Sequence, residues 1–280
     1  MKLACLVLVL ALAVACGDGS RIVVGAKNFT EQRILGELVA QTAEALGVPV
    51  RRRFDLGGTF VCDAALRAGD VDAYVEYTGT ALTAVLKEQP ENDPRRVFER
   101  VAAAYRAAGL EWLPPLGFDN TFAMVVRGDE TVTTLSEAVA VARQWKAGFG
   151  YEFRTRPDGY PALQRVYGLA FAELRTMDLG LLYRALGDRQ VDVVAGSATD
   201  GLIDAMKLRV LADDRKAFPP YEAAPVVRAD TLARHPRLRE ALAKLGGTIS
   251  ATDMRRMNHA VDGEHRDAAT VVRAWLAAHP

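Results

Sequence analysis

The chain has 280 residues, of which 50% are hydrophobic and 25% are charged, which is ordinary for a globular protein and long enough for two domains with cores of their own. The 35 Lys and Arg residues balance the 35 Asp and Glu residues, so the formal net charge is zero. Nucleic-acid-binding proteins usually carry a basic excess, so this balance argues against a nucleic-acid partner.

The N-terminus has the pattern of an export signal. A lysine precedes an apolar run over 3–14, which is too short to span a membrane as a helix. Cys16 follows small residues in a pattern that resembles the processing site of bacterial lipoproteins, with an ordinary signal peptide as the alternative. We therefore expect a signal peptide over 1–15, a lipid on Cys16 and a tether over 16–21. The protein would then lie in the periplasm or on the outer face of the cell membrane, anchored by its lipid.

The three cysteines limit which disulfides the exported chain can form. Loss of Cys5 with the signal and lipidation of Cys16 would leave Cys62 alone, so no internal disulfide could form. Cys62 could be a nucleophile or an attachment point for a cofactor. Its small and apolar neighbours favour the other interpretation, a buried residue that packs as a small hydrophobic side chain.

From residue 22 onward, short apolar strands alternate with amphipathic helices. A strand over 22–24 is followed by a helix to about residue 46, with Asn28 or Thr30 as its cap. The next expected elements are a strand over 49–56, a helix over 57–69, a strand over 70–77, helices over 80–89 and 94–109, and a strand over 122–126. This repetition predicts an α/β fold with parallel strands.

The middle of the chain repeats this alternation. Thr134 and Glu137 form a capping-box pattern at the start of a helix over 133–145. The elements expected after it are a strand over 149–153, a loop over 154–159, helices over 160–168 and 179–190, a strand over 191–197, a helix over 199–207, a strand from 210 with a loop to 221, an extended segment over 224–230, and helices over 236–245 and 250–278.

Two α/β units joined by two extended crossing strands predict a bilobed clamshell. The crossings are expected near 122–127 and 222–228. Lobe 1 would comprise 22–123 and 224–280, and lobe 2 would comprise 124–223. Ligands of such sheets bind at the carboxyl ends of the strands, so we expect the site between the lobes.

Seven short motifs occur in order along the chain: GAKNFTEQ, LGGT, YVEYTGT, GFDNTFAM, RPDGYPAL, TDGLI and DDRKAFPPYEAAPVV. Together they resemble the substrate-binding proteins of osmoprotectant ABC transporters, which take up glycine betaine, choline, carnitine or proline betaine. The resemblance covers about residues 21–277 and implies a periplasmic-binding-protein clamshell of type II topology. It also implies a monomeric carrier without a cofactor, which delivers a small zwitterion to ABC permease and ATPase subunits.

The resemblance also implies which residues hold the carboxylate of the ligand. In glycine-betaine-binding members this is done by the Lys of GAKNFTEQ, the second Thr of EYTGT and the Arg before PDG, which are here Lys27, Thr80 and Arg156. Arg offers a planar fork of donors and Lys a point charge. Thr80 lies where a helix is expected to begin, so its backbone N–H could contribute as well.

The family's cation site is a box of aromatic rings, because a trimethylammonium group has no N–H and is held by ring faces. The matching positions are Tyr77, Phe122, Ser197 and Tyr221, with Asn120 where some members carry Asp. Typical betaine or choline binders have Tyr at all four ring positions. Ser197 therefore removes one wall, which should weaken cation binding by about 1–2 kcal/mol unless another ring replaces it.

A neighbouring ring such as Tyr160, Phe118 or Phe60 could replace the missing wall. Asn120 removes a charge that would favour choline, which has no carboxylate. Because Lys27 and Arg156 are retained, the sequence favours a ligand that bears a carboxylate, such as glycine betaine.

Other classes of function find less support. The four histidines lie in the C-terminal helical part, away from the motifs, and neither a catalytic pair nor the spacing of a metal site is present. We therefore expect no enzymatic activity and no metal. Two alternatives stay open: a binding protein of the same fold for a different zwitterion or amino acid, and a sensory ligand-binding lipoprotein.

Overall fold

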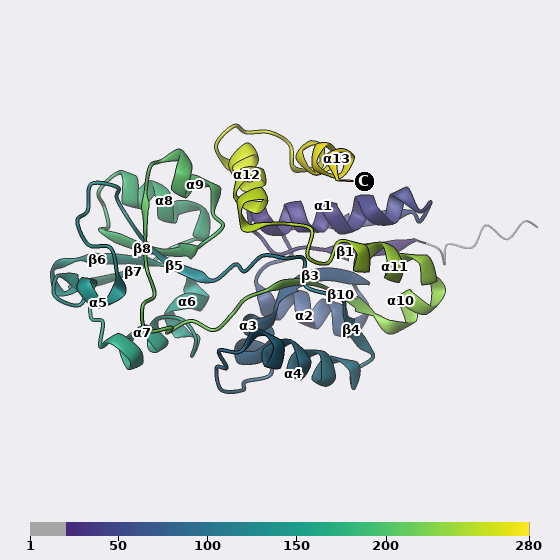
Figure 1. Cartoon of the computed structure of the whole chain (residues 1–280), viewed down its shortest axis with the longest axis horizontal. Coiled ribbons are helices and arrows are strands. Elements are labelled where there is room, and N and C mark those ends of the chain that lie inside the picture. Colours follow the sequence, from purple (N-terminus) through teal and green to yellow (C-terminus); the bar gives the residue numbers. More distant parts are fainter. Residues whose placement is uncertain (1–20, 280) are drawn as a thin grey trace, which may run out of the picture.

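The computed structural model describes residues 21–279, which form two lobes that are each built on a five-stranded sheet (Figure 1). The expected signal peptide over 1–15, the lipid on Cys16 and nearly all of the tether lie outside the described residues. Within 21–279, no helix is long and apolar enough to cross a membrane.

The first sheet has the strand order β2-β1-β3-β10-β4. β1, β2 and β3 run parallel, and β10 is antiparallel to both of its neighbours. The strands are β1 (Ile22–Gly25), β2 (Val50–Arg53), β3 (Ala73–Tyr77), β4 (Leu110–Trp112) and β10 (Ala223–Arg228).

The second sheet repeats this arrangement with the order β7-β6-β8-β5-β9. β6, β7 and β8 run parallel, and β5 is antiparallel to its neighbours. The strands are β5 (Phe122–Val126), β6 (Lys146–Phe149), β7 (Glu173–Thr176), β8 (Val193–Ser197) and β9 (Arg209–Leu211). In each sheet, the strand that follows a crossing is inserted beside the third strand of the parallel set. This is the type II topology, and the predicted bilobed clamshell is confirmed.

Helices cover both faces of the first sheet, so its central strand β3 is buried along its whole length. On one face α1 packs against β1, β2 and β3 and is itself covered by α11, α12 and α13, while α2 and α4 lie on the other face (Figure 1). The bounds are α1 (Thr30–Ala45), α2 (Thr59–Ala68), α3 (Thr78–Thr80), η2 (Ala81–Val85), α4 (Pro94–Arg106), α10 (Ala229–Arg234), α11 (Pro236–Lys244), α12 (Ala251–Asp262) and α13 (Ala268–Ala278).

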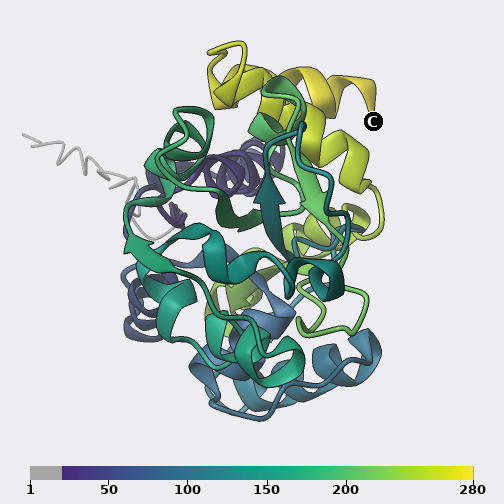
Figure 2. The ribbon, with the colours of Figure 1, turned by 90° about the vertical axis from the view of Figure 1, so that its left-hand side faces the viewer.

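The lobe of the second sheet, whose teal and green ribbon faces the viewer in Figure 2, has shorter helices. α8 packs on β6 and β8 through Leu182 and Leu186, which are buried with Val194. The helices of this lobe are α5 (Leu135–Ala138), η3 (Ala142–Gln144), α6 (Tyr151–Thr155), α7 (Tyr160–Tyr167), α8 (Leu179–Gly187) and α9 (Gly201–Ala205). α12 of the first lobe packs against α9, so the C-terminal helices also contact the second lobe.

The chain passes between the sheets over 113–121 and again over 212–222. These two connections lie side by side, because the Asn120 N–H donates to the Tyr221 carbonyl at 3.0 Å. The crossings expected at 122–127 and 222–228 are therefore misplaced, since those segments are largely β5 and β10 inside the sheets. Apolar strand-forming residues do not distinguish a crossing from a sheet strand. The lobe boundaries at 123/124 and 223/224 remain a prediction.

Several local expectations are wrong for identifiable reasons. The strand expected over 149–153 ends at Phe149, where Gly150 precedes α6 instead. The helix expected over 133–145 shrinks to α5 and η3, although its capping box between Thr134 and Glu137 is present. α1 begins after Phe29 without a side-chain cap, so neither Asn28 nor Thr30 caps it.

Candidate functional site

A cavity of about 610 Å³ lies between the lobes and is lined by residues of both sheets' strand ends and of the two connections. All eight residues predicted from the motifs line it: Lys27, Tyr77, Thr80, Asn120, Phe122, Arg156, Ser197 and Tyr221. The structure therefore brings the predicted carboxylate-holding and cation-holding residues together, while the role of each stays a prediction.

The turn after β3 places Tyr77 and Thr80 at the cavity. β3 ends at Tyr77, and the helical segment α3 follows at once and continues as the π-helical η2. Gly79 is required in this turn because of close packing: a Cβ there would collide with the Pro220 carbonyl and lie 3.0 Å from the ring of Tyr221. This contact seats Tyr221 against the turn.

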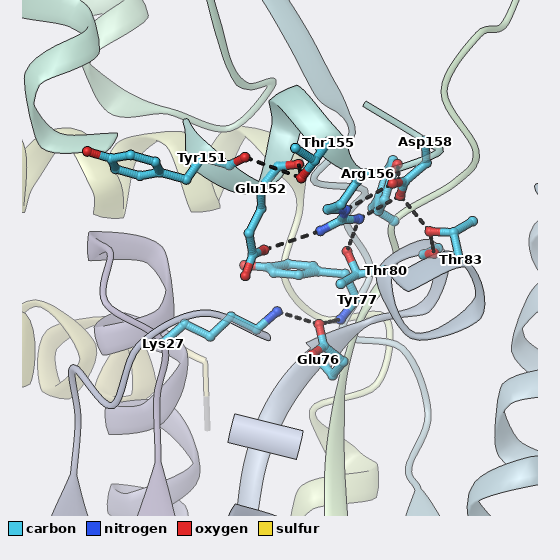
Figure 3. A network of polar contacts seen from close by, with 12 residues as sticks. Lys27, Glu76, Tyr77, Thr80, Thr83, Tyr151, Glu152, Thr155, Arg156 and Asp158 are labelled. Carbon is cyan, nitrogen blue, oxygen red and sulfur yellow. Dashed lines mark hydrogen bonds and ion pairs between the residues drawn. The ribbon is translucent and has the colours of Figure 1, made fainter. Parts of the chain in front are cut away.

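Arg156 lies in the loop between α6 and α7 and is buried, with 7% of its surface exposed. Its Nε donates to Asp158 Oδ1 at 2.9 Å, and its Nη2 donates to Asp158 Oδ2 at 2.5 Å and to the Thr80 hydroxyl at 3.2 Å (Figure 3). Nη1 makes no hydrogen bond within the described residues, and Glu152 Oε2 lies 3.7 Å from it. The guanidinium is thus fixed along one edge and keeps donors on the other.

Asp158 is fully buried and also accepts from the hydroxyls of Thr83 at 2.6 Å and Tyr221 at 2.8 Å. Burial alone would raise its pKa, but the hydrogen bonds and charge of Arg156 outweigh burial and hold the pKa below its usual range. Asp158 is therefore an ionised anchor that orients both Arg156 and a ring of the predicted box.

Lys27 follows β1 and is likewise paired, its Nζ lying 2.5 Å from Glu76 Oε1. Both side chains are buried, and Glu76 also accepts from the Tyr77 N–H at 2.7 Å and from the Tyr74 hydroxyl at 3.0 Å. The Lys27 ammonium lies 5.0 Å from the centre of the Tyr77 ring. An ammonium has three donors, so Lys27 keeps capacity for a ligand beside Glu76.

Three of the four expected ring positions carry rings that face one cavity. Phe122 packs against Tyr221 with ring centres 5.1 Å apart, and the Arg156 guanidinium lies 5.2 Å from the Phe122 ring centre. Tyr77 stacks on Phe29 at 6.5 Å. The fourth position, Ser197, ends β8 and presents no ring.

None of the three candidate rings, Tyr160, Phe118 and Phe60, lines the cavity, so none of them replaces the missing wall. Tyr160 packs on Phe149 inside the second lobe, and Phe118 is buried in the core of the molecule. The further rings that do line the cavity are Phe29, Tyr151, Phe153 and Tyr183.

The buried carboxylate of Glu31, a residue of α1 that was not assigned to the binding site from the sequence, joins the lobes beside the cavity. It accepts from the Tyr77 hydroxyl at 2.7 Å, from Asn120 Nδ2 at 2.8 Å, from Asn258 Nδ2 at 3.0 Å and from the Thr199 hydroxyl. Burial raises the pKa of Glu31 to about 7, although these hydrogen bonds oppose the shift. Glu31 belongs to the GAKNFTEQ motif, but an acidic residue in the first turn of a helix also interacts favourably with the helix dipole, so its position did not indicate a role in the site.

A second carboxylate, that of the half-buried Asp200, lies directly behind Ser197. Its Oδ2 accepts from the Ser197 N–H at 2.8 Å and from the Tyr183 hydroxyl at 2.5 Å. Burial raises the pKa of Asp200 to about 6. The wall that lacks a ring is therefore backed by a carboxylate.

Cys62 is buried in α2 and does not line the cavity, which agrees with its interpretation as a packing residue. Burial raises the pKa of its thiol to about 11. Within residues 21–279, no three His, Cys, Asp or Glu side chains are grouped in the way that metal ligands are.

Two lobes of type II topology around one cavity of rings and fixed cationic groups define a solute-binding protein. Residues 20–278 match the family described as the substrate-binding domain of the ABC-type glycine betaine transport system, and the chain belongs to this family. Members of this family work outside the cell membrane with the permease components of ABC transporters.

Named relatives agree with this assignment. The chain is 34% identical over 271 residues to the glycine-betaine-binding protein of Pseudomonas aeruginosa, covering 91% of this chain and 87% of that protein. It is 33% identical over 261 residues to the carnitine transport binding protein OpuCC of Listeria monocytogenes, covering 90% and 85%. A crystal structure described as a glycine betaine/carnitine/choline ABC transporter superposes with a TM-score of 0.78 at 31% identity, covering 92% of this chain and 98% of that one.

Proposed function

We propose that this protein binds a zwitterion with a carboxylate at one end and an ammonium group at the other, of the glycine betaine type, and delivers it to an ABC permease and its ATPase. The observation that carries the proposal is Arg156, whose guanidinium is fixed by Asp158 and Thr80 with Nη1 left for a ligand. Rings that suit an ammonium group line the same cavity.

The named relatives support this class of ligand, because glycine betaine and carnitine both combine a carboxylate with a quaternary ammonium group. The carboxylate would bind between Arg156 Nη1, Thr80 and Lys27, and it would displace Glu152 from its position 3.7 Å from Nη1. The ammonium end would lie among Tyr77, Phe122 and Tyr221. The Tyr77 hydroxyl donates to Glu31 and the Tyr221 hydroxyl donates to Asp158, while Phe122 packs against the Tyr221 ring.

The proposed mechanism is closure of the lobes on the ligand. Lys27 and Thr80 follow strands of the first sheet, whereas Arg156 belongs to the lobe of the second sheet. A ligand that contacts both sets favours the closed state by its differential affinity, and the closed form would dock on the permease. The protein would act as a monomer without catalysis, held at the membrane by a lipid on Cys16.

Isothermal titration of the purified protein with glycine betaine, carnitine and choline tests the proposal. Arg156→Lys keeps a positive charge beside Asp158 but removes the Nη1 donors, so it should weaken binding of both carboxylate ligands at least ten-fold. Arg228→Lys is the matched control, since Arg228 pairs with Asp230 at the same spacing far from the cavity. Tight choline binding with no response to glycine betaine, or unchanged affinity in Arg156→Lys, would exclude a carboxylate site at Arg156.

A further inference from the structure

The hydroxyl of Ser197 is an unused hydrogen-bonding group on the wall of the cavity. Ser197 is half-buried and lines the cavity, and its N–H donates to Asp200. Its Oγ forms no hydrogen bond with any residue between 21 and 279. Where a tyrosine ring would present an apolar face to methyl groups, this serine presents two lone pairs and one O–H.

The surroundings of Ser197 are rich in acceptors. Asp200 lies behind it, and a Cβ on Gly196 would collide with the Tyr183 hydroxyl, so this wall is closed by polar atoms. Asn258 also lines the cavity and is 1% exposed, and its Oδ1 has no partner among the described residues. The orientation of this amide is settled chemically, because its Nδ2 faces two acceptors, Glu31 Oε2 at 3.0 Å and the Thr199 carbonyl at 2.7 Å.

The charged side chains that line the cavity also favour a cationic group near Ser197. Each cationic side chain that lines it has a carboxylate partner: Lys27 with Glu76, Arg33 with Asp55, and Arg156 with Asp158. The acidic side chains that line it are Glu31, Glu152, Asp178, Asp200 and Asp262. Among the described residues that line the cavity, a cationic group near Ser197 therefore meets the Asp200 carboxylate and no unpaired positive charge.

We propose that the ligand's cationic end carries at least one N–H, which it donates to Ser197 Oγ, so that the preferred ligands are tertiary ammonium zwitterions such as dimethylglycine. This inference rests on the function proposed above and names the substrate class of the same site. A fully methylated cation leaves the Ser197 hydroxyl without a partner, whereas an N–H forms a charge-assisted hydrogen bond with it. The remaining methyl groups still pack on Tyr77, Phe122 and Tyr221.

Glycine betaine and dimethylglycine form a matched pair for the test, because they differ by one methyl group on nitrogen. The measurement is isothermal titration of the purified protein at pH 7, where both ligands are cationic at nitrogen. We expect dimethylglycine to bind at least ten-fold more tightly than glycine betaine. Ser197→Ala should lower this preference about ten-fold, as expected for loss of one hydrogen bond to a charged group. Ser197→Tyr should reverse it by restoring a ring face.

Thr252→Ala, on the exposed face of α12 away from this cavity, is the control and should leave both dissociation constants unchanged. Tighter binding of glycine betaine than of dimethylglycine by the wild type, or an unchanged preference in Ser197→Ala, would overturn the inference and leave the proposed function intact. If glycine betaine, dimethylglycine, carnitine and choline all failed to bind, the result would contradict the proposed function and therefore also this inference.

Discussion

Replacement of Asp158 by Asn tests whether the buried ion pair is the anchor of the site. Asp158 is fully buried and accepts four hydrogen bonds, two from Arg156 and one each from Thr83 and Tyr221. An amide keeps the shape but loses the charge and one acceptor oxygen. The buried guanidinium would then lack its close counter-charge, and the amide nitrogen would face a donor.

Removing one member of a buried ion pair typically costs about 3–5 kcal/mol. For a protein of this size each kcal/mol lowers the midpoint of thermal unfolding by about 2–4 °C, so Asp158→Asn should lower it by at least about 6 °C. Because the folded pKa of Asp158 is lowered, its contribution is present above its unfolded pKa of 3.8 and is lost as the pH falls through the folded value. The deficit should therefore be complete at pH 7 and shrink below about pH 4.

Differential scanning calorimetry at pH 7 and at pH 3, below the unfolded pKa of 3.8, measures both effects. Asp230→Asn is the matched control, because Asp230 receives two hydrogen bonds from Arg228 at the same sequence spacing, with the two side chains 51% and 25% exposed. An exposed pair of this kind is worth less than about 1 kcal/mol. Equal losses in the two variants would refute the claim that burial makes Asp158 the anchor. A saturating carboxylate ligand should also stabilise Asp158→Asn more than the wild type, since it can replace the lost charge.

Three further predictions concern other buried or competing groups. Because burial raises the pKa of Glu31 to about 7, the free energy of unfolding of the wild type should increase by up to about 3 kcal/mol as the pH falls from 8 to 4.5. Glu31→Gln should show no such increase when urea unfolding is measured at both pH values, and an equal increase in the two proteins would contradict this prediction. Glu152 competes with a ligand carboxylate for Arg156, so Glu152→Gln should tighten glycine betaine or dimethylglycine binding by up to about five-fold in titration, and weaker binding would show that Glu152 helps to hold the ligand. The Cys62 thiol, buried and with a pKa of about 11, should react with a disulfide reagent at pH 8 at least a hundred-fold more slowly in the native protein than in urea, and rapid native labelling would place it at the surface.

The fold class followed from the alternation of strands and helices, whereas the members of the cavity followed from the resemblance of the seven motifs to osmoprotectant-binding proteins. Sheet geometry agrees with that resemblance within each lobe, because Tyr77 and Thr80 lie at the carboxyl end of β3 and Ser197 lies at the carboxyl end of β8. The short edge strands β4 and β7 escaped prediction because Leu110–Trp112 and Glu173–Thr176 have no run of alternating residues long enough to stand out.

The polar partners of the site could not be predicted from local patterns. Glu76 binds Lys27 across 49 positions of sequence, and Asn258 reaches Glu31 across 227, distances over which neither periodicity nor capping rules act. Asp158 is only two residues from Arg156 in the sequence, but the tripeptide Pro-Asp-Gly is also common in exposed turns, so the sequence alone does not indicate a buried ion pair. Tyr183 was expected only as part of a helix, and its hydroxyl bond to Asp200 depends on how α8 is placed over β8.

The inserted antiparallel strands have a consequence for the order in which the protein can fold. The second sheet uses only strands between Phe122 and Leu211, so one continuous stretch of chain can complete it. The first sheet cannot be completed in that way, because β10 separates β3 from β4 and is not synthesised until Ala223–Arg228. Among the described strands, β4 therefore lacks its sheet partner until the later segment is available. The ligand cavity is lined by the strand ends of both sheets and by Asn258 and Asp262 of α12, so it cannot be complete before the C-terminal helices are in place.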